Sequence, residues 1–399
     1  MSEIRVTNVL GENGNSPVNF TKGINMSGIV TATSFVPTTG QLSHRNLIIN
    51  GAMNVAQRAS SSTANGYGDL DRWKHEYAGT NENPTFAQAS LTTSDTPYTL
   101  GLTKTYKLTN GNQTSGLQAS SQINFNQQIE AQDIRNSGWD YKNPNSYVTL
   151  SFWVRSSVSQ NFNGFVKTAD GSMYIYPYET GTLSANTWTK ITKSIPGNSN
   201  LTINDDNGSG LQVFAIAIYG TNMTDNSVTY NQWAGWSSGL RSKDQSNSWF
   251  TTNDATLEIT GVQLEVGPVA TPFEHLRFGD ELERCRRYYQ VILDRSIDSG
   301  DDSGLGGTPY SNGSNPIYVP VRFYPPMRTK PTVESSSAGN EFRTRHGDIQ
   351  NFTSFTGFNT VSRLGGTLIT SAGGNKTVGD YYWIETDQGS AKLAVSAEL

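Results

Sequence analysis

Cysteine is almost absent from this 399-residue chain, which has Cys285 alone. No intrachain disulfide can form, which excludes a disulfide-stapled scaffold and a cysteine-based zinc site. Charged residues are also scarce at 16%, against about a quarter in ordinary globular proteins. With a net charge of -5 and scattered Lys and Arg, the chain lacks the basic footprint that nucleic-acid binding requires. We therefore expect no nucleic-acid partner.

Long apolar runs are missing as well. No stretch approaches the roughly 20 apolar residues of a membrane span, and "MSEIRVTNVL" lacks the basic start and apolar run of a secretory signal. We expect no membrane insertion and synthesis in a cytoplasm. The four histidines lie far apart without metal-ligand spacing, so no metal and no cofactor are expected: His44, His75, His275 and His346.

Glycine, asparagine, serine and threonine are abundant, together with 8 Trp, 18 Tyr and 16 Phe. This is the composition of strands and loops, and the aromatic residues supply core material. A mass of 43.6 kDa leaves room for two or three domains. The sequence therefore predicts an all-β protein with more than one module.

The segment "YVTLSFWVRSS" alternates strictly, so that one strand face carries apolar side chains: Val148, Leu150, Phe152 and Val154. Trp153 lies on the opposite face, where it must cover a loop, a subunit or a ligand. The segments "NTWTKITKSIPG", "LQVFAIAIYG" and "ATLEITGVQLEV" continue this pattern, and in the last one the alternation changes phase at Gly261, which predicts a β-bulge. Many strands without helices between them predict an antiparallel β-sandwich, a jelly roll, over residues 46–276.

The segment "FGDELERCRRYYQVI" predicts a connecting helix over residues 277–293. Acidic residues come early and arginines late, which suits the helix dipole. Its spaced apolar residues are Leu282, Cys285, Tyr288, Tyr289 and Ile292. They form either an oligomer interface around an axis or a face packed on the chain's own sandwich. Residues 294–399 then predict a small C-terminal β-sandwich.

The first 45 residues contain short apolar bursts between Gly, Asn and Pro turns. Strands this short cannot bury a core alone. Residues 1–45 therefore form either an extended segment for attachment and oligomerisation, or a flexible tail.

The sequence gives little indication of catalytic activity. A glycosidase needs two carboxylates across a cleft, and Asp69 and Asp71 in "GYGDLDRW" are candidates by type. The neighbours Arg72 and Trp73 favour a structural ion pair beside a core indole. We expect no catalytic residue and no enzyme.

Sugar binding is better supported, because aromatic faces pack against sugar C–H surfaces. Two aromatic clusters are candidate glycan contacts: Trp233, Trp236 and Trp249 in a Gly/Ser-rich segment, and Tyr174, Tyr176 and Tyr178 at period two on one strand face. The alternative is that these residues fill the core or an oligomer interface.

Several segments together carry a resemblance: "NLIINGAMNVAQR", "DRW" at Asp71–Trp73, "TLSFWVRSS", "NTWTKITKSIPG", "ITGVQLEVGPVATPFEHLRFGDELERCRRYYQ", "PPMRTKPTV" and "VSAEL". From about residue 44 onwards, the chain resembles structural and tail-fibre proteins of tailed bacteriophages, particularly those of cyanobacteria. The resemblance implies a virion appendage with a carbohydrate-binding-module-like jelly roll, a helical joint and a C-terminal β-domain, often homotrimeric.

The resemblance also implies partners. Residues 1–45 would attach to other phage tail or capsid proteins, and the sandwiches would contribute to host attachment through a surface glycan. Two alternatives stay open: a purely structural tail or capsid adaptor without receptor contact, and a polysaccharide-degrading tailspike.

Overall fold

The computed structural model describes residues 43–296, 304–305, 310–311, 316–346, 348–371 and 380–399. Its regular elements are nearly all strands, and the strand ladders in this part of the chain run antiparallel. This confirms the all-β fold class. The predicted attachment segment falls almost entirely outside the described residues.

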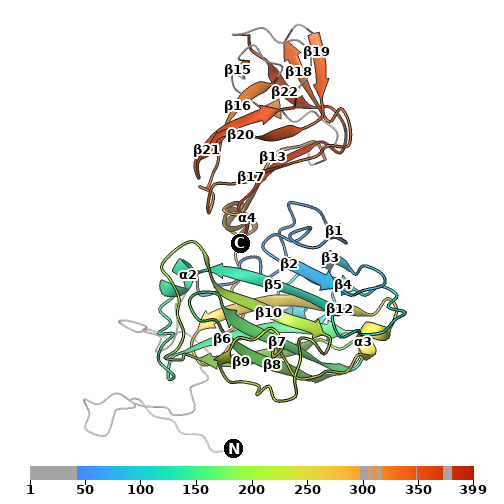
Figure 1. Ribbon diagram of the computed structural model, residues 1–399, viewed down its shortest axis with the longest axis vertical. Coiled ribbons are helices and arrows are strands. Elements are labelled where there is room, and N and C mark those ends of the chain that lie inside the picture. Colours follow the sequence, from blue (N-terminus) through green and yellow to red (C-terminus); the bar gives the residue numbers. More distant parts are fainter. Residues whose placement is uncertain (1–42, 297–303, 306–309, 312–315, 347, 372–379) are drawn as a thin grey trace, which may run out of the picture. The chain divides into compact units, whose positions relative to one another are not determined.

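Two six-stranded sheets form the larger sandwich (Figure 1). The first sheet has the order β1 (Ser61–Ser62), β3 (Thr85–Ser90), β4 (Lys104–Thr109), β12 (Thr256–Val266), β6 (Tyr147–Ser156), β9 (Thr189–Pro196). The second sheet has the order β11 (Ala234–Gly235), β8 (Tyr174–Leu183), β7 (Gln160–Thr168), β10 (Ser209–Tyr219), β5 (Gln122–Glu130), β2 (Lys74–Ala78).

The core of this sandwich lies between the two sheets. Leu150 and Phe152 of β6 share one buried cluster with Val213 and Ile216 of β10. The predicted apolar face of β6 is confirmed, since all four of its side chains are 0% exposed. Burial of each such side chain contributes roughly 1.5 to 3 kcal/mol to folding. Trp153, on the other face of β6, packs with a smaller cluster that includes Leu102 and so covers a loop.

The predicted bulge at Gly261 is also confirmed. Its φ is +61°, and the pairing of β12 with β6 shifts register between Thr260 and Gln263. A Cβ at Gly261 would lie 2.8 Å from Leu102 Cδ1. Both the left-handed backbone and the close approach therefore require glycine.

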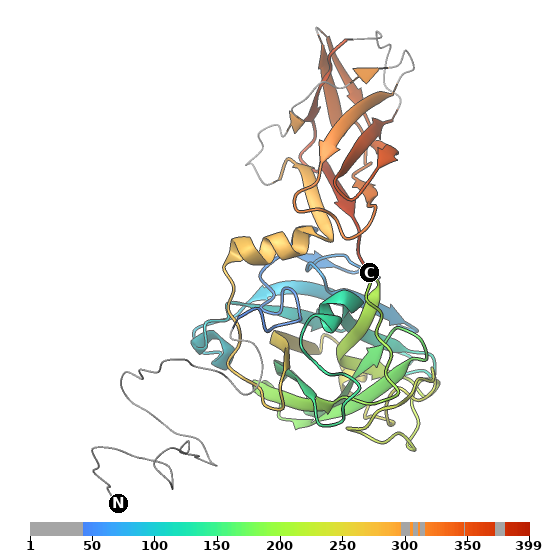
Figure 2. The same cartoon turned by 90° about the vertical axis from the view of Figure 1, so that its left-hand side faces the viewer.

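The connecting helix is shorter than predicted. The helix α4 covers Phe278–Arg286, and the chain continues as β13 (Tyr289–Asp294) instead of remaining helical to residue 293 (Figure 2). Aromatic and branched residues in "YYQVI" suit a strand, and β13 pairs with β23 (Lys392–Ser396). Tertiary pairing therefore overrides the helical spacing.

The C-terminal strands form three sheets around a second core of aromatic and aliphatic side chains that includes Phe342, Phe352 and Leu368. The sheets have the orders β13, β23, β17 (Thr332–Ser335); β14 (Gly304–Leu305), β22 (Trp383–Thr386), β18 (Phe342–His346), β19 (Asp348–Phe352); and β15 (Tyr310–Ser311), β16 (Ile317–Arg322), β21 (Gly365–Thr370), β20 (Phe355–Val361).

Three further helices are single turns: α1 (Thr96–Thr99), α2 (Ala131–Arg135) and α3 (Ser248–Thr251). Within the described ranges, the helices are all too short or too polar to cross a membrane.

Candidate functional site

The sheet that contains β10 presents one face to the core and the opposite, outer face to solvent and to a covering loop. Residues paired directly across neighbouring strands share a face. Phe165 of β7 lies opposite Phe214 of β10, which lies opposite Asn126 of β5. The adjacent row contains Asn163, Ala217 and Asn124. Strand register therefore brings aromatic rings and amides together on the outer face.

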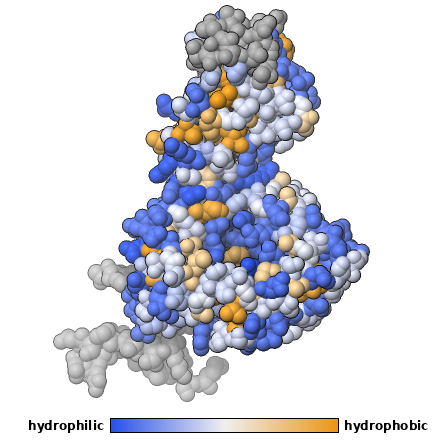
Figure 3. Space-filling model, in the orientation of Figure 1, coloured by the Kyte–Doolittle hydropathy of each residue, from blue (hydrophilic) through white to orange (hydrophobic). Residues whose placement is uncertain are grey.

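Four partly exposed side chains form what we call the outer-face patch: Lys167, Phe214, Trp236 and Arg241. Phe214 stacks on the buried Phe165 with ring centroids 4.2 Å apart, and Trp236 lies 6.2 Å from Phe165. Lys167 Nζ lies 4.5 Å from the Trp236 ring, and Arg241 Cζ lies 5.4 Å from it. The surface over these strands is mostly hydrophilic (Figure 3). The patch thus combines exposed ring surface with cationic groups.

The loop between β10 and β12 is fixed in place on this face by several hydrogen bonds. Tyr230 donates to Asn163 Oδ1 at 2.7 Å, and Asn163 donates to the Lys243 carbonyl at 3.2 Å. The backbone N–H of Trp236 donates to the Met173 carbonyl at 2.9 Å. Trp236 is therefore held by its backbone against Met173, directly before strand β8.

Trp236 is the one predicted glycan contact that lies on the outer face. Trp249 is 0% exposed and donates to the Thr256 carbonyl at 3.0 Å, so its expected exposure is wrong. Tyr176 and Tyr178 are 3% and 0% exposed, because their shared strand face is the core face. Neither tyrosine presents a ring to a sugar. Their burial agrees with the alternative that the aromatic residues fill the core.

The two remaining aromatic candidates, Trp233 and Tyr174, lie at the rim of the core. Both are partly exposed and pack against the core cluster. Trp233 donates to the Pro196 carbonyl at 2.7 Å and contacts the Tyr176 ring edge-on at 5.4 Å. Both residues pack on the core side of the sheet, whereas the outer-face patch lies on its other side. Their role as glycan contacts stays a prediction.

The apolar residues assigned to an oligomer interface are mostly covered by their own chain. Cys285, Tyr288 and Tyr289 are 0%, 1% and 3% exposed, while Leu282 and Ile292 are partly exposed. Burial raises the pKa of the Cys285 thiol well above its ordinary value, so the thiol is a poor nucleophile. The interface assignment is wrong for the three buried residues, and the alternative of packing within one chain holds for them.

Arginines cover the two tyrosines. The Arg72 guanidinium lies 3.5 Å from the centroid of the Tyr288 ring, and Arg58 lies 3.7 Å from that of Tyr289. Both guanidinium groups pair with Glu398. In this buried cluster, the two arginines of the larger sandwich contact both tyrosine rings and pair with Glu398, which follows strand β23. These contacts hold the C-terminal end of the chain against the larger sandwich.

The carboxylates Asp69 and Asp71 are both 0% exposed. Tyr106 donates to Asp69 Oδ1 at 3.1 Å, and the Gln57 N–H donates to Asp71 Oδ1 at 2.8 Å. Burial raises the pKa of each carboxyl to about 6. The predicted pairing of Asp71 with Arg72 is wrong, since Arg72 pairs with Glu398, whereas Trp73 is the expected core indole.

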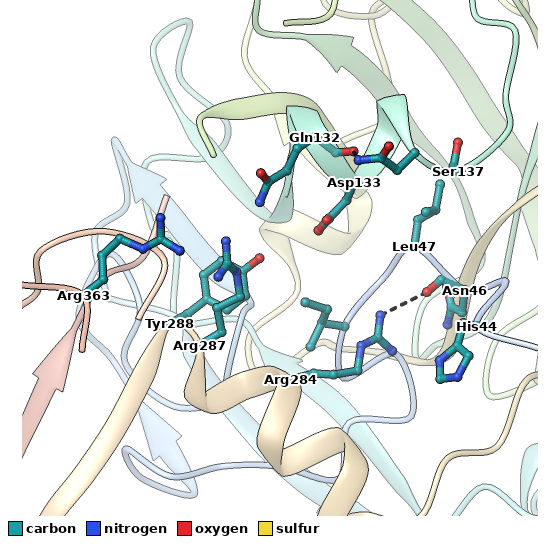
Figure 4. Close-up of a pocket in the computed structure, with 12 residues that line it drawn as sticks. His44, Asn46, Leu47, Gln132, Asp133, Ser137, Arg284, Arg287, Tyr288 and Arg363 are labelled. Atoms are coloured by element: carbon teal, nitrogen blue, oxygen red, sulfur yellow. Dashed lines mark hydrogen bonds between the residues drawn. The ribbon is translucent and has the colours of Figure 1, made fainter. Parts of the chain in front are cut away.

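A second candidate site is a cavity of about 440 Å³ beside α4 (Figure 4). Arg284, Arg287 and Arg363 line it together with Asp133. Arg287 makes two hydrogen bonds of 2.7 Å to Glu130, and Arg284 donates to the Asn46 carbonyl at 3.1 Å. Because two of its cations are occupied within the chain, we interpret this cavity as structural. In the described part of the chain, no group of three or more potential metal ligands comes together.

The residues that sequence reasoning missed are Phe165, Lys167, Phe214 and Arg241. Their signal is present in "NFNGFVKT", where Phe165 and Lys167 share one strand face. Linking that face to Phe214 requires the register between β7 and β10. Sequence alternation alone does not supply that register.

No family model matches the sequence, and no curated protein matches it. The solved structures similar to the chain include the enzymatically active domain of tailspike protein 4 from bacteriophage CBA120, at 10% identity and a TM-score of 0.30. That match covers 56% of this chain, which spans only 21% of the tailspike chain.

Two other similar structures are bacterial. A putative sugar binding protein from Bacteroides thetaiotaomicron is 13% identical with a TM-score of 0.31, covering 56% of this chain and 100% of that chain. A tandem CBM22 domain from Paenibacillus barcinonensis Xyn10C is 10% identical with a TM-score of 0.28, covering 92% of this chain and 100% of that chain. Similarities this weak do not assign a function, so we base the functional proposal on the chain's own residues.

Proposed function

We propose that this protein is a non-enzymatic virion appendage of a tailed bacteriophage that binds a host-surface glycan through the outer-face patch. The observation that supports the proposal most is the partly exposed Trp236, held by its backbone beside Phe214 and the buried Phe165. A partly exposed indole supported by other rings is a platform on which a pyranose C–H face packs. The partly exposed amide of Gln212, which lies opposite Lys167 on the outer face, then supplies donors and an acceptor for hydroxyl groups.

Binding to the patch is tested with full-length protein on an array of defined bacterial and plant oligosaccharides. Trp236→Ala should weaken the affinity of retained glycans by about tenfold or more, because the main stacking surface is lost. Trp383→Ala is the matched control, since Trp383 is 44% exposed and lies in the C-terminal strands. We expect it to bind like the wild type. Wild-type protein that retains no glycan, or a Trp236→Ala variant that binds equally, contradicts the proposal.

The homotrimer, attachment to other tail or capsid proteins through residues 1–45, and the location on the virion are parts of the same proposal. Light scattering on the full chain and on a chain lacking residues 1–45 tests the assembly. A trimer in both places the contacts beyond the first 45 residues, and a trimer that dissociates on truncation assigns them to that segment. A monomer in both contradicts the homotrimer.

A further inference from the structure

The outer-face patch holds two cations close to one indole ring. Lys167 Nζ and the Arg241 guanidinium both lie within 5.4 Å of the Trp236 ring centroid, and Arg241 also lies 4.9 Å from the Tyr219 ring. Burial and the nearby Arg241 lower the pKa of the Lys167 ammonium. Like charges in a partly desolvated site repel each other, which costs free energy in the unliganded protein.

Neither cation has a carboxylate within 4.0 Å among the residues that the structure describes. Glu76, which lies on the same sheet face and attracts Lys167, already pairs with Lys74 at 2.9 Å. Glu179, also on this face, accepts a hydrogen bond from Asn161 at 2.7 Å. The acidic groups on this face are therefore occupied by other partners.

Several buried polar atoms on the same face lack hydrogen-bond partners, among them Arg241 Nε, Asn124 Nδ2 and the Tyr219 hydroxyl. Arg241 makes one long bond of 3.4 Å through Nη1 to Gln122. Asn124 is 1% exposed, and its carbonyl accepts from Asn126 at 3.4 Å. A buried donor left unpaired costs stability. Arg241 Nε and Asn124 Nδ2 can only donate, so a ligand that satisfies them must offer acceptors.

We propose that the outer-face patch selects an anionic sugar residue, one that carries a carboxylate or sulfate. This inference rests on the proposed glycan binding and specifies its ligand class. The sugar ring packs on Trp236, and the acidic group accepts hydrogen bonds from the Lys167 ammonium and the Arg241 guanidinium. A planar guanidinium with free N–H groups matches such an oxyanion geometrically.

The experiment uses full-length protein and paired probes: uronate-bearing oligosaccharides with their carboxyl-reduced forms, and sulfated oligosaccharides with their desulfated forms. Removing the acidic group should weaken binding by about tenfold, the loss of one charge-assisted hydrogen bond or more. Raising NaCl from about 50 to about 500 mM should weaken only the acidic member of a pair, because salt screens exposed charges. Which pair responds distinguishes a carboxylate from a sulfate.

Two variants distinguish the preference for an anionic sugar from glycan binding as such. Lys167→Gln and Arg241→Gln should each weaken binding of the acidic probe by about tenfold more than they weaken binding of the neutral probe. Arg286→Gln, on the exposed face of α4, is the matched control and should change neither. Equal binding of the acidic and neutral members would overturn the anionic-sugar inference while leaving glycan binding intact. Failure of the wild type to bind any probe of the panel would overturn both.

Discussion

The cationic side chains beside Tyr288 and those beside Trp236 both contact aromatic rings but differ in their charged partners. Arg72 is 1% exposed and pairs with Glu398, and Arg287 makes two 2.7 Å bonds to Glu130. Arg241 and Lys167 also contact aromatic rings, yet neither has a carboxylate within 4.0 Å among the described residues. A cation paired within the chain stabilises the fold, whereas a cation left unpaired beside an exposed ring is available to a ligand.

This difference also explains why the cavity beside α4 is the weaker candidate site. It is lined by more arginines than the outer-face patch, but Glu130 and the Asn46 carbonyl already occupy two of them. Glu130 is 0% exposed, and its pKa is lowered, because hydrogen bonds from Arg287 and Tyr288 outweigh the cost of burial. A ligand there would have to displace these bonds.

The largest expected effect on stability is at Arg72, a cation that is paired within the chain. Arg72→Ala leaves Glu398 in a largely buried position without its nearest cation, which should lower the free energy of unfolding by about 3 to 5 kcal/mol. Urea denaturation followed by tryptophan fluorescence measures the change. Arg286→Ala, on an exposed helix position, should change stability by less than about 0.5 kcal/mol. Equal effects of the two variants would contradict a structural role for Arg72.

A medium effect is expected for a buried anion that lacks a cationic partner. The pKa of Asp69 is raised to about 6, so the folded protein binds this proton more tightly than the unfolded chain does. Acidification from about pH 6 to about pH 4 should therefore stabilise the wild type relative to Asp69→Asn by about 2 to 3 kcal/mol. His75, whose pKa burial lowers to about 4, acts in the opposite direction in both proteins, and in the wild type its Nδ1 lies 3.6 Å from Asp69 Oδ1.

Unfolding free energies of the wild type and of Asp69→Asn, measured between pH 8 and pH 4, test this expectation. The difference between the two proteins should be constant above about pH 7 and should grow in favour of the wild type below about pH 6. A difference that does not change with pH would show that Asp69 has an ordinary pKa in the folded protein.

The smallest effect on stability is expected at the unpaired cations. Lys167→Gln and Arg241→Gln each lose a cation–π contact but relieve repulsion, so the free energy of unfolding should change by less than about 1 kcal/mol. Thermal denaturation of the unliganded variants checks this. A loss of unfolding free energy as large as that of Arg72→Ala would show that Lys167 and Arg241 are structural cations and would contradict their availability to a ligand.

The sequence predicts the parts of this fold that depend on local alternation. The apolar face of β6 and the bulge at Gly261 follow from side-chain parity alone. The end of α4 does not, because "YYQVI" fits either helical or strand spacing. Its pairing with β23, which is distant in sequence, decides the outcome. Boundaries set by long-range pairing are therefore where sequence reasoning fails.

The candidate site was harder to predict for the same reason. The period-two spacing of Tyr174, Tyr176 and Tyr178 correctly places them on one strand face, but parity does not reveal whether that face points into the core. Only packing against the opposite sheet shows that it does. Trp236 is predictable because it lies in a Gly/Ser-rich segment with little strand pattern, while its supporting residues Phe165 and Phe214 require strand register.

The most direct test of the account is oxidative footprinting of the full-length protein, read by mass spectrometry, with and without the tightest-binding glycan. Trp236 and Phe214 should become protected from oxidation when the glycan is bound. Trp249, which is fully buried, should stay unreactive in both states and serves as an internal reference. Unchanged oxidation of Trp236, with protection confined to residues that line the cavity beside α4, would contradict the assignment of the outer face as the ligand surface.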